Sequence, residues 1–368
     1  MTMKTFQSDR LTEPALVVWK SRAVANLRKM AAKAAAGRVR FRPHFKTHQS
    51  TEIGRWFFEE GVRAITVSSP RMAAAFARSG WKDITVAVPL NPHCSDVYNR
   101  LAAEINLHLL TDSARAVEHL ADTVRRRLSL WIEIDSGQHR TGIDPSDMRA
   151  LVETADRIRH HRLLHLAGLL THSGHSYHRT ADDAFPAALE RIYRETLQRM
   201  EAARQVLEKE GFGPLQISVG DTPTCSTVSD FGGVDEIRPG NFLFYDLMQL
   251  QIGSCSEADI ALAVACPVIS RAPQRGELVV HGGAVHLSKE TIAWQSVPIY
   301  GRVAEIRPGG WSAMHPTAFV KSLTQEHGVI QADRNWVECK QIGDTLMIIP
   351  VHACLAVDAL GAQYRFLA

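Results

Sequence analysis

Long apolar runs are missing from the sequence, since no segment approaches the roughly 18 consecutive apolar residues that a membrane-spanning helix requires. The N-terminus also lacks the uninterrupted apolar segment of a signal peptide. The 6 cysteines are scattered without a paired framework, which in a chain without an export signal indicates reduced thiols rather than disulfides. These absences predict a cytosolic protein that is not inserted in a membrane.

An excess of charge of one sign is missing as well. The 42 basic and 39 acidic residues leave a net charge of +3, which is too small to indicate a nucleic acid or a membrane surface as partner. The sequence contains no internal repeat, low-complexity segment or flexible linker. Its 368 residues, 45% of them hydrophobic, are enough for one large domain or two unequal domains with a buried core.

Short β-rich runs alternate with longer helix-forming stretches from about residue 15 to 250. Strands are expected at 15–18, 39–41, 64–67, 83–88, 107–110, 128–134, 165–170, 216–219 and 236–238. Helices are expected at 21–36, 49–60, 70–79, 93–104, 112–126, 146–160 and 181–210. Eight or so strand–helix units of this kind predict an α/β fold with a parallel sheet, and favour a closed (β/α)8 TIM barrel over an open sheet.

The pattern changes after about residue 255, where short strands with turn signals dominate. These strands are expected at 261–268, 277–281, 291–294, 301–306, 328–331 and 345–350. The sequence therefore predicts a barrel domain over 15–250 and a mostly β domain over 251–368, which residues 1–14 are expected to join. In a barrel the loops after the strands lie on the catalytic face, so the residues that follow strands should converge there, namely Lys46, Arg140, His172, Gly220 and Arg238.

Lys46 lies in residues 42–48, which read RPHFKTH, directly after an alternating run that predicts a short strand. Neighbouring cations (Arg42, His44 and His48) and partial burial both lower the pKa of a lysine, because each disfavours the ammonium form. An uncharged amine is what Schiff-base chemistry requires. The alternative is a basic strand end that faces solvent.

Three further loops carry polar or glycine residues after strands. Residues 133–142 (EIDSGQHRTG) deliver Arg140, although a turn with an ordinary surface arginine has the same sequence. Residues 218–224 (SVGDTPT) are small and hydroxyl-bearing, as in a phosphate cradle, but many loops share this composition. In residues 238–246 (RPGNFLFYD), Gly240 allows close approach of a ligand and Arg238 can hold an anion or a ring nitrogen, whereas a glycine turn into a core strand explains the segment equally well.

A fourth segment lies near the C-terminus, where residues 350–358 read PVHACLAVD. On an extended segment His352 and Cys354 point to the same side, which suits two zinc ligands from one strand. A buried cysteine beside a hydrogen-bonded histidine is the alternative. Residues 326–328 and 172–175 also contain histidines that could supply outer contacts to a metal or carry a proton.

Together these segments resemble the fold-type III pyridoxal-phosphate (PLP) enzymes, in the branch of D-serine dehydratase and D-threonine aldolase. The similarity runs from about residue 13 to 360 and keeps all the motifs in one order. It implies an alanine racemase-like barrel followed by a β domain, a PLP cofactor and a homodimer.

The resemblance also implies roles for individual residues. RPHFKTH resembles the Schiff-base motif, with Lys46 as the cofactor lysine, and EIDSGQHRTG resembles the segment whose arginine, here Arg140, contacts the phenolic oxygen of the cofactor. THSGHSY at 171–177 resembles the loop beside the cofactor ring. The roles implied for the remaining residues are ring contacts for His172 and Tyr177, phosphate contacts for Gly220, Thr222, Gly240 and Asn241, a pyridine contact for Arg238, and metal ligation by His352 and Cys354.

The metal pair helps to choose within the branch. The dehydratases hold zinc through His-x-Cys, whereas the aldolases more often carry a carboxylate at the second position and use Mn2+ or Mg2+. Cys354 therefore favours zinc, because thiolate prefers softer metals. Two departures bear on the substrate: His281 stands where relatives commonly carry an acidic residue, and Gln49 replaces a frequent basic residue.

The resemblance implies a zinc-assisted PLP lyase that eliminates water from D-3-hydroxy amino acids such as D-serine, with Lys46 and His172 as catalytic residues. Retro-aldol cleavage to glycine and an aldehyde uses the same residues and is the first alternative. A PLP-carrier protein without metal or substrate is a second alternative, against which the extra β domain and the His352–Cys354 pair argue. A metal-dependent hydrolase barrel, which would not need Lys46, is a third.

Overall fold

A computed structural model describes residue 6 and residues 11–177 and 187–367. The chain forms two compact units. The barrel unit comprises Arg28–Lys46 and Ser50–Gly240, and the sheet unit comprises Met1–Leu27, Thr47–Gln49 and Asn241–Ala368. None of the helices in the described ranges has the length and apolar character needed to cross a membrane. The domain limits expected from the sequence stay a prediction.

The barrel unit is built on eight parallel strands that follow the order β2-β9-β8-β7-β6-β5-β4-β3. Their bounds are β2 (Arg40–Phe41), β3 (Ala64–Val67), β4 (Asp83–Pro89), β5 (Asn106–Thr111), β6 (Leu128–Glu133), β7 (Leu164–His172), β8 (Gln216–Gly220) and β9 (Glu236–Ile237). The segment after β2 reaches β3, since Thr66 accepts a hydrogen bond from Phe45 N at 2.8 Å and donates one to Pro43 O at 2.9 Å. The predicted (β/α)8 barrel is therefore confirmed, with β2 and β3 joined by this short bridge.

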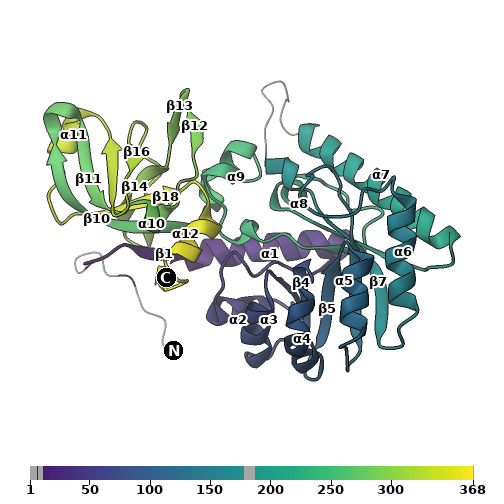
Figure 1. The fold of residues 1–368 in the computed structure, drawn as a ribbon. Helices are drawn as coiled ribbons and strands as arrows, with labels where there is room; N and C mark the ends of the chain where they lie inside the picture. The colour runs from purple at the N-terminus through teal and green to yellow at the C-terminus, as the bar shows by residue number, and fades with distance from the viewer. Residues whose placement is uncertain (1–5, 7–10, 178–186, 368) are drawn as a thin grey trace. The chain divides into compact units, whose positions relative to one another are not determined.

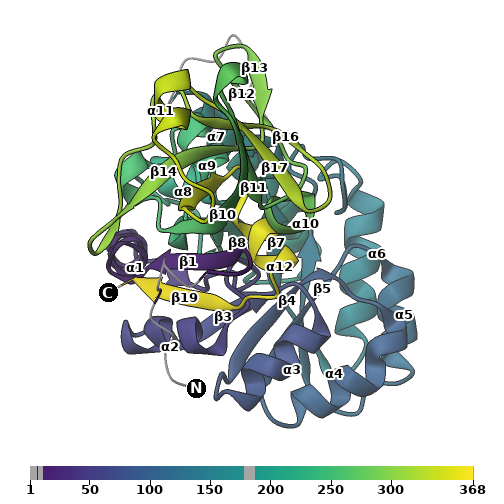
Figure 2. The ribbon, with the colours of Figure 1, turned by 90° about the vertical axis from the view of Figure 1, so that its left-hand side faces the viewer.

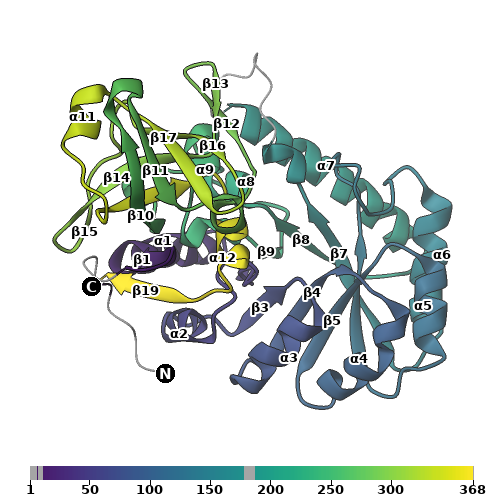
Figure 3. The same ribbon diagram turned by 60° about the vertical axis from the view of Figure 1, so that its left-hand side comes forward.

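Helices alternate with these strands and cover the outside of the barrel (Figures 1 and 3). They are α1 (Lys20–Ala36), α2 (Thr51–Glu59), α3 (Pro70–Arg78), α4 (Ser95–Ala102), α5 (Ala114–Ala121), α6 (Met148–Arg159), α7 (Ala187–Lys209) and α8 (Thr222–Thr227). Serine caps start α3 and α5, where Ser69 and Ser113 accept hydrogen bonds from the backbone. The first residues of the helix expected at 181–210, up to 186, lie outside the described residues.

Gly168 marks an irregularity in the barrel wall, where the pairing of β6 with β7 shifts register. Its φ is +157°, and a Cβ atom built on it would lie 2.1 Å from Gln216 O of the neighbouring strand. A side chain at this position would therefore collide with the backbone of β8. Only glycine satisfies both requirements.

We expect Gly168→Ala to destabilise the protein by about 3 kcal/mol or more, because both the backbone clash and the positive φ oppose alanine. Gly61→Ala is the matched control, since Gly61 has φ +85° but no atom within 4 Å of its Cβ position. That control should lose only about 1 kcal/mol. Urea unfolding of both variants measures the difference, and equal losses would show that the contact with Gln216 is not limiting.

The sheet unit is a mostly antiparallel sheet whose strands follow the order β11-β17-β16-β14-β18-β10-β1-β19, with β15 paired to β14 and β12–β13 forming a separate hairpin. The strands are β1 (Ala15–Trp19), β10 (Leu262–Ala272), β11 (Glu277–His281), β12 (Ile292–Trp294), β13 (Val297–Ile299), β14 (Gly301–Arg307), β15 (Gly310–Trp311), β16 (Phe319–Leu323), β17 (His327–Gln331), β18 (Thr345–Pro350) and β19 (Tyr364–Leu367). The helices of this unit are α9 (Leu247–Ile252), α10 (Ala284–Leu287), α11 (Arg334–Glu338) and α12 (Ala353–Ala359). The β-rich character expected after residue 255 is confirmed.

One strand lies in a different sheet from the one expected. The sequence placed residues 15–18 in the series of barrel strands, but β1 pairs antiparallel with β10 and parallel with β19 (Figure 2). Its core residues are completely buried in this sheet, as Leu16, Val17 and Val18 each have 0% exposure. The barrel is completed without it, so the first barrel strand is β2.

Candidate active site

Lys46 follows β2 at the carboxyl end of the barrel strands, where the sequence predicted it. The preceding residue, Phe45, is fully buried, and its ring centroid lies 4.8 Å from that of Phe57, 4.9 Å from that of Phe76 and 5.1 Å from that of Trp81. This aromatic cluster fixes the backbone directly beside Lys46. The lysine side chain itself is exposed.

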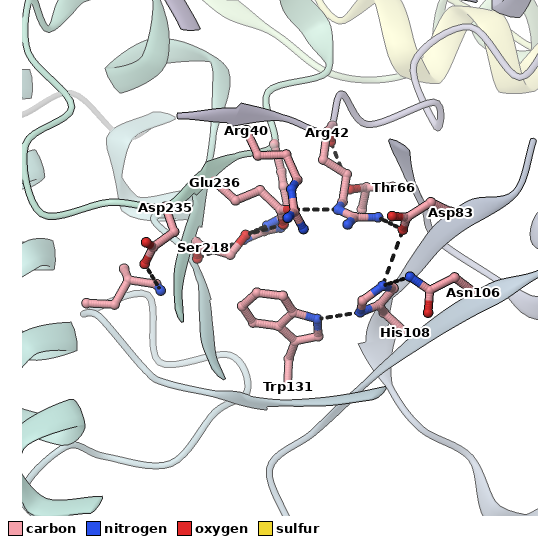
Figure 4. A network of polar contacts seen from close by, with 12 residues as sticks. Arg40, Arg42, Thr66, Asp83, Asn106, His108, Trp131, Ser218, Asp235 and Glu236 are labelled. Atoms are coloured by element: carbon pink, nitrogen blue, oxygen red, sulfur yellow. Dashed lines mark hydrogen bonds and ion pairs between the residues drawn. The ribbon is translucent and has the colours of Figure 1, made fainter. Parts of the chain in front are cut away.

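Two parts of the local reason that the sequence offered for a reactive lysine are wrong, namely partial burial and the charge of Arg42, whereas the effect of His44 and His48 stays a prediction. Lys46 is exposed rather than partly buried. Arg42 is not a free cation beside it, because its guanidinium forms ion pairs with Glu236 and Asp83, each at 2.5 Å (Figure 4). The case for Lys46 therefore rests on its place at the carboxyl end of β2 and on the residues that meet there.

His172 is the last residue of β7, and it therefore lies at the carboxyl ends of the barrel strands, as Lys46 does. Its Nδ1 lies 2.5 Å from the carbonyl oxygen of Gly220 at the end of β8. Burial and the nearby charge of Lys46 lower the pKa of His172 to about 3, with further contributions from Arg140 and Arg238. The ring is therefore neutral near pH 7, its Nδ1 donates to Gly220, and the lone pair is on Nε2.

The loop after β8 fits the phosphate cradle expected from the sequence. A Cβ atom on Gly220 would lie 2.9 Å from the Cβ of Arg238, so only glycine leaves room at this point. Thr222 Oγ1 is buried and has no hydrogen-bond partner within the part of the chain that the structure describes. The backbone N–H of Thr222 lies 3.4 Å from the hydroxyl of Tyr177, which brings the predicted ring-side tyrosine to the same loop. A buried hydroxyl of this kind is suited to an anionic oxygen.

The shape of that loop depends on Asp221, which caps α8. Its carboxylate accepts hydrogen bonds from Thr224 N at 2.7 Å and from the hydroxyl of Ser176 at 3.1 Å. Burial raises the pKa of Asp221 to about 6 in spite of these bonds. The sequence motif contained Asp221, but its role in joining the loops after β7 and β8 was not predicted.

Arg140 lies on the loop after β6, as predicted, and its side chain is exposed. The loop is shaped by Asp135, whose carboxylate accepts hydrogen bonds from Gly137 N at 2.9 Å and His139 N at 3.0 Å. The charge of Arg140 also acts on the buried carboxyl of Glu133, whose pKa is raised by burial. Glu133 was not identified as a site residue from the sequence.

Arg238 follows β9 and is 4% exposed. Its Nε donates to the hydroxyl of Ser218 at 2.7 Å, and its Nη2 donates to the carbonyl of Thr171, next to His172. Burial lowers the pKa of Arg238 to about 10, so that it remains a cation near neutral pH. The barrel unit therefore brings Lys46, Arg140, His172, Tyr177, Gly220, Thr222 and Arg238 to the carboxyl ends of its strands, and Gly240 is its last residue.

The predicted metal ligands belong to the sheet unit and differ in local structure from the prediction. The sequence predicted an extended segment, but β18 ends at Pro350, His352 is the N-cap of α12 and Cys354 lies in its first turn. The two side chains still interact. Burial disfavours the charged imidazole, but the hydrogen bond and charge of Cys354 outweigh it and raise the pKa of His352 to about 9.

The donor set at this position fits a soft divalent metal. His352 Nδ1 is buried and has no hydrogen-bond partner among residues 11–177 and 187–367. The sulfur of Cys354 lies 3.3 Å from the hydroxyl of Thr47, which comes directly after Lys46 in the sequence. Imidazole nitrogen and thiolate sulfur are the ligands that zinc prefers.

Asp246 supports this segment and was not predicted from the sequence. Its buried carboxylate accepts hydrogen bonds from the Asn241 side chain at 2.6 Å and from Ala353 N, between His352 and Cys354, at 2.8 Å. Burial raises the pKa of Asp246, opposed by the charge of His352. The side-chain nitrogen of Asn241 is thus held by Asp246, and its Oδ1 is buried without a partner in the described chain. A phosphate contact from Asn241 stays a prediction.

A second group of potential metal ligands lies in the sheet unit, where Glu326 Oε2 is 3.7 Å from His281 Nε2 and 3.8 Å from His286 Nε2. The backbone N–H of Gly283 donates to His286 Nδ1 at 3.2 Å. The proton of the neutral ring is therefore on Nε2, the atom that faces Glu326. Nε2 of His286 therefore presents a proton to the carboxylate and has no lone pair for a metal ion. We do not assign His281, His286 and Glu326 to a metal site.

Comparisons with known proteins agree with this geometry. A family described as alanine racemase, N-terminal domain, matches residues 20–247, and one described as a putative serine dehydratase domain matches residues 261–365. The D-threo-3-hydroxyaspartate dehydratase of Delftia sp. (strain HT23) is 32% identical, covering 96% of this chain and 93% of that enzyme. The D-serine dehydratase of Dictyostelium discoideum is also 32% identical, covering 97% of this chain and 93% of its own.

Solved structures extend the comparison. The Delftia dehydratase superposes with a TM-score of 0.87 at 30% identity, covering 95% of this chain and 93% of that one. A variant of D-threo-3-hydroxyaspartate dehydratase in which a cysteine is replaced by alanine, described as metal-free, gives a TM-score of 0.88 at 30% identity and covers 99% and 96% of the two chains. The chain therefore belongs to the fold-type III pyridoxal-phosphate family that joins an alanine racemase N-terminal domain to a serine dehydratase domain.

Proposed function

We propose that the protein is a PLP- and zinc-dependent lyase that converts D-3-hydroxy amino acids, with D-serine and D-threo-3-hydroxyaspartate first, to a 2-oxo acid and ammonia. The observation that carries the proposal is the neutral His172 placed close to Lys46, beside the Gly220–Thr222 loop with its unpartnered hydroxyl. The names of two relatives that match over nearly the whole chain support the substrate class. A cytoplasmic homodimer is the proposed form of the enzyme.

The residues of the barrel unit divide into those proposed to hold the cofactor and those proposed to act on the substrate. Lys46 would hold the cofactor covalently, Gly220 and Thr222 would receive its phosphate, and Arg140, Tyr177 and Arg238 would contact its ring and substituents. Gly240 and Asn241 are proposed as further phosphate contacts. When bound, PLP withdraws electrons from the substrate and so makes the Cα proton removable.

One side chain of the barrel unit is proposed as a base and a second as a hydrogen-bond acceptor near a bound substrate. The amine of Lys46 is proposed as the base for the Cα proton, since an amine is basic once it is released from a covalent link. Nε2 of His172 is proposed to accept a hydrogen bond from bound substrate, because its Nδ1 is committed to Gly220 O at 2.5 Å. The low pKa of His172 keeps this nitrogen available over the neutral range.

The sheet unit supplies the proposed metal ligands, His352 and Cys354. Zinc held there would act as a Lewis acid on the substrate hydroxyl and make it a better leaving group. The metal-free description of a cysteine-to-alanine variant of a related dehydratase supports the assignment of Cys354. Mn2+ or Mg2+ is less suited to the site because a thiolate is a soft ligand.

Product analysis separates the candidate functions. The protein is incubated with PLP and Zn2+, then with D-serine and with D-threonine, and ammonia, 2-oxo acid, glycine and aldehyde are quantified. We expect ammonia and 2-oxo acid in equal amounts from D-serine, since elimination of water gives an enamine that hydrolyses to these two products. Glycine plus an aldehyde would establish the retro-aldol alternative, and no turnover with stoichiometric bound PLP would indicate a carrier. Turnover that persists without PLP would contradict a PLP enzyme.

A further inference from the structure

Polar side chains meet in the interior of the barrel unit, where Figure 4 shows Arg42, Glu236 and Ser218 in one network of contacts. Arg40 and Glu236 are the first residues of β2 and β9, Ser218 lies in the middle of β8, and Arg238 follows β9. Glu236 and Arg238 are two positions apart on an extended segment, so their side chains point to the same side. We refer to Arg42, Glu236, Ser218 and Arg238 as the interior relay.

The part of the interior relay around Arg42 is an ion-pair cluster. Arg42, with 0% exposure, donates from Nε to Glu236 Oε2 at 2.5 Å and from Nη1 to Asp83 Oδ1 at 2.5 Å. His108 Nε2 lies 3.2 Å from the same Asp83 oxygen. Trp131 Nε1 donates to His108 Nδ1 at 3.2 Å, which leaves Nε2 of His108 facing Asp83. Each buried charge in this part of the barrel faces a partner.

The rest of the interior relay connects Glu236 to Arg238 through the hydroxyl group of Ser218. Ser218 Oγ donates its single proton to Glu236 Oε1 at 2.7 Å and accepts the N–H of Arg238 Nε at 2.7 Å. The carboxylate therefore determines the direction in which the hydroxyl points, and the hydroxyl offers its lone pair to Arg238. Nη2 of Arg238 is held by Thr171 O, so two of its nitrogens have fixed acceptors.

The far end of the relay reaches the proposed cofactor site. The carbonyl that accepts from Arg238 belongs to Thr171, the residue before His172. The guanidinium of Arg238 also lies beside Gly220, since its Cζ and Nη1 are each 3.2 Å from the position that a Cβ atom on this glycine would take. The interior relay thus ends between His172 and the loop of residues 220–222.

We propose that Glu236, acting through the hydroxyl of Ser218, fixes the guanidinium of Arg238 in the cofactor site, which makes Ser218 and Glu236 positioning residues for the reaction. This inference rests on the proposed function, because it concerns a group that contacts the cofactor. It assigns a role to residues that touch neither substrate nor cofactor. A guanidinium with rigid acceptors on two nitrogens presents the remaining one in a single direction, which is the requirement for a preorganised ring contact.

The competing explanation is that the relay only stabilises the barrel. Removing one partner of a buried ion pair destabilises a protein strongly, so Glu236→Gln alone cannot separate the two explanations if it fails to fold. Ser218→Ala avoids this difficulty, because it removes no charge and leaves the pair of Arg42 and Glu236 in place. Asp235→Asn is the matched control: this exposed neighbour of Glu236 bonds to Ile217 N at 2.7 Å and lies outside the relay.

The test uses the full chain loaded with PLP and Zn2+, in wild-type form and as Ser218→Ala, Glu236→Gln, the double variant, and Asp235→Asn. We measure kcat and KM with D-serine, the visible absorbance spectrum of the bound cofactor as a function of pH, and the melting temperature. In Ser218→Ala we expect kcat to fall about tenfold with KM changed less than about threefold, together with a shifted pH midpoint of the absorbance change. The double variant should lose no more kcat than the worse single variant, because both changes break one chain of contacts.

The outcomes are distinct. Wild-type kcat and spectra in Ser218→Ala, with only a lower melting temperature, would show a structural relay and overturn the proposal, and so would losses that multiply in the double variant. Asp235→Asn should match the wild type in both kinetics and spectra; a change equal to that of Ser218→Ala would also overturn the proposal. A wild-type protein that binds PLP without lyase activity would overturn the proposed function, and the positioning role with it.

Discussion

Lys46→Ala should abolish turnover, with kcat reduced by more than roughly a thousandfold, because the variant loses both the covalent hold on the cofactor and the proposed base. The protein should remain folded, since the side chain is exposed and the anchoring contacts belong to Phe45. Borohydride reduction after incubation with PLP, followed by peptide mass spectrometry, checks the cause directly. The wild type should gain the mass of the reduced cofactor on the peptide that contains Lys46.

Lys46→Arg serves as the control for charge, because it keeps a cation at this position but cannot form the covalent link. It should be as inactive as Lys46→Ala. The control peptide is the one that contains Lys33, whose amine donates to the carbonyl oxygens of Cys225 and Ser226 at 2.9 Å and is therefore already engaged. Labelling of another lysine in the wild type, or full activity in Lys46→Ala, would refute the assignment of Lys46.

Cys354→Ala should lose the bound metal and at least about a hundredfold in kcat, because a single imidazole does not retain zinc and the substrate hydroxyl then leaves unassisted. His352→Ala should behave in the same way. Metal content by mass spectrometry of the purified protein, measured beside the rate of ammonia release from D-serine, tests both effects. Cofactor loading should be unchanged in these variants, since Lys46 is intact.

Cys339→Ala is the matched control, as it removes an exposed cysteine of the same sheet unit. It should keep one metal ion per chain and the wild-type rate. If Cys354→Ala retained its metal, the ligands would have to be sought elsewhere in the chain. If it lost the metal but kept its rate, the metal would be structural and the Lewis-acid role would be wrong.

The barrel could be predicted from the sequence because its strands are short apolar runs that alternate with capped helices. Strand β1 could not be assigned correctly, because a short apolar run with three buried residues in a row has the same pattern in a barrel as in the core of another sheet. Its partners β10 and β19 lie more than 240 residues later in the chain, and no local signal identifies them. Strands β13, β15, β16 and β19 were missed, being short or interrupted by charged residues.

The candidate site was predicted from the order of its motifs, whereas the contacts that shape it in the structure were not predicted. The part of the local argument for Lys46 that used Arg42 was wrong because acids distant in the sequence, Asp83 and Glu236, pair with Arg42. A signal for the relay was present: polar residues alternate with apolar ones at Arg40 and Arg42 and again at Glu236 and Arg238, in strands expected to be buried. The sequence does not show which of these charges meet, because pairing depends on the register of the barrel.

Formation of 2-oxo acid from the two enantiomers of serine is the decisive test of a PLP- and zinc-dependent D-amino acid lyase. The metal-stripped and PLP-stripped protein is supplied with PLP, with Zn2+, with both or with neither, and 2-oxo acid and ammonia are followed with D-serine and with L-serine. We expect turnover only with D-serine and only when both PLP and Zn2+ are present, with equal amounts of the two products. Equal rates with L-serine, or full turnover with either PLP or Zn2+ omitted, would contradict it.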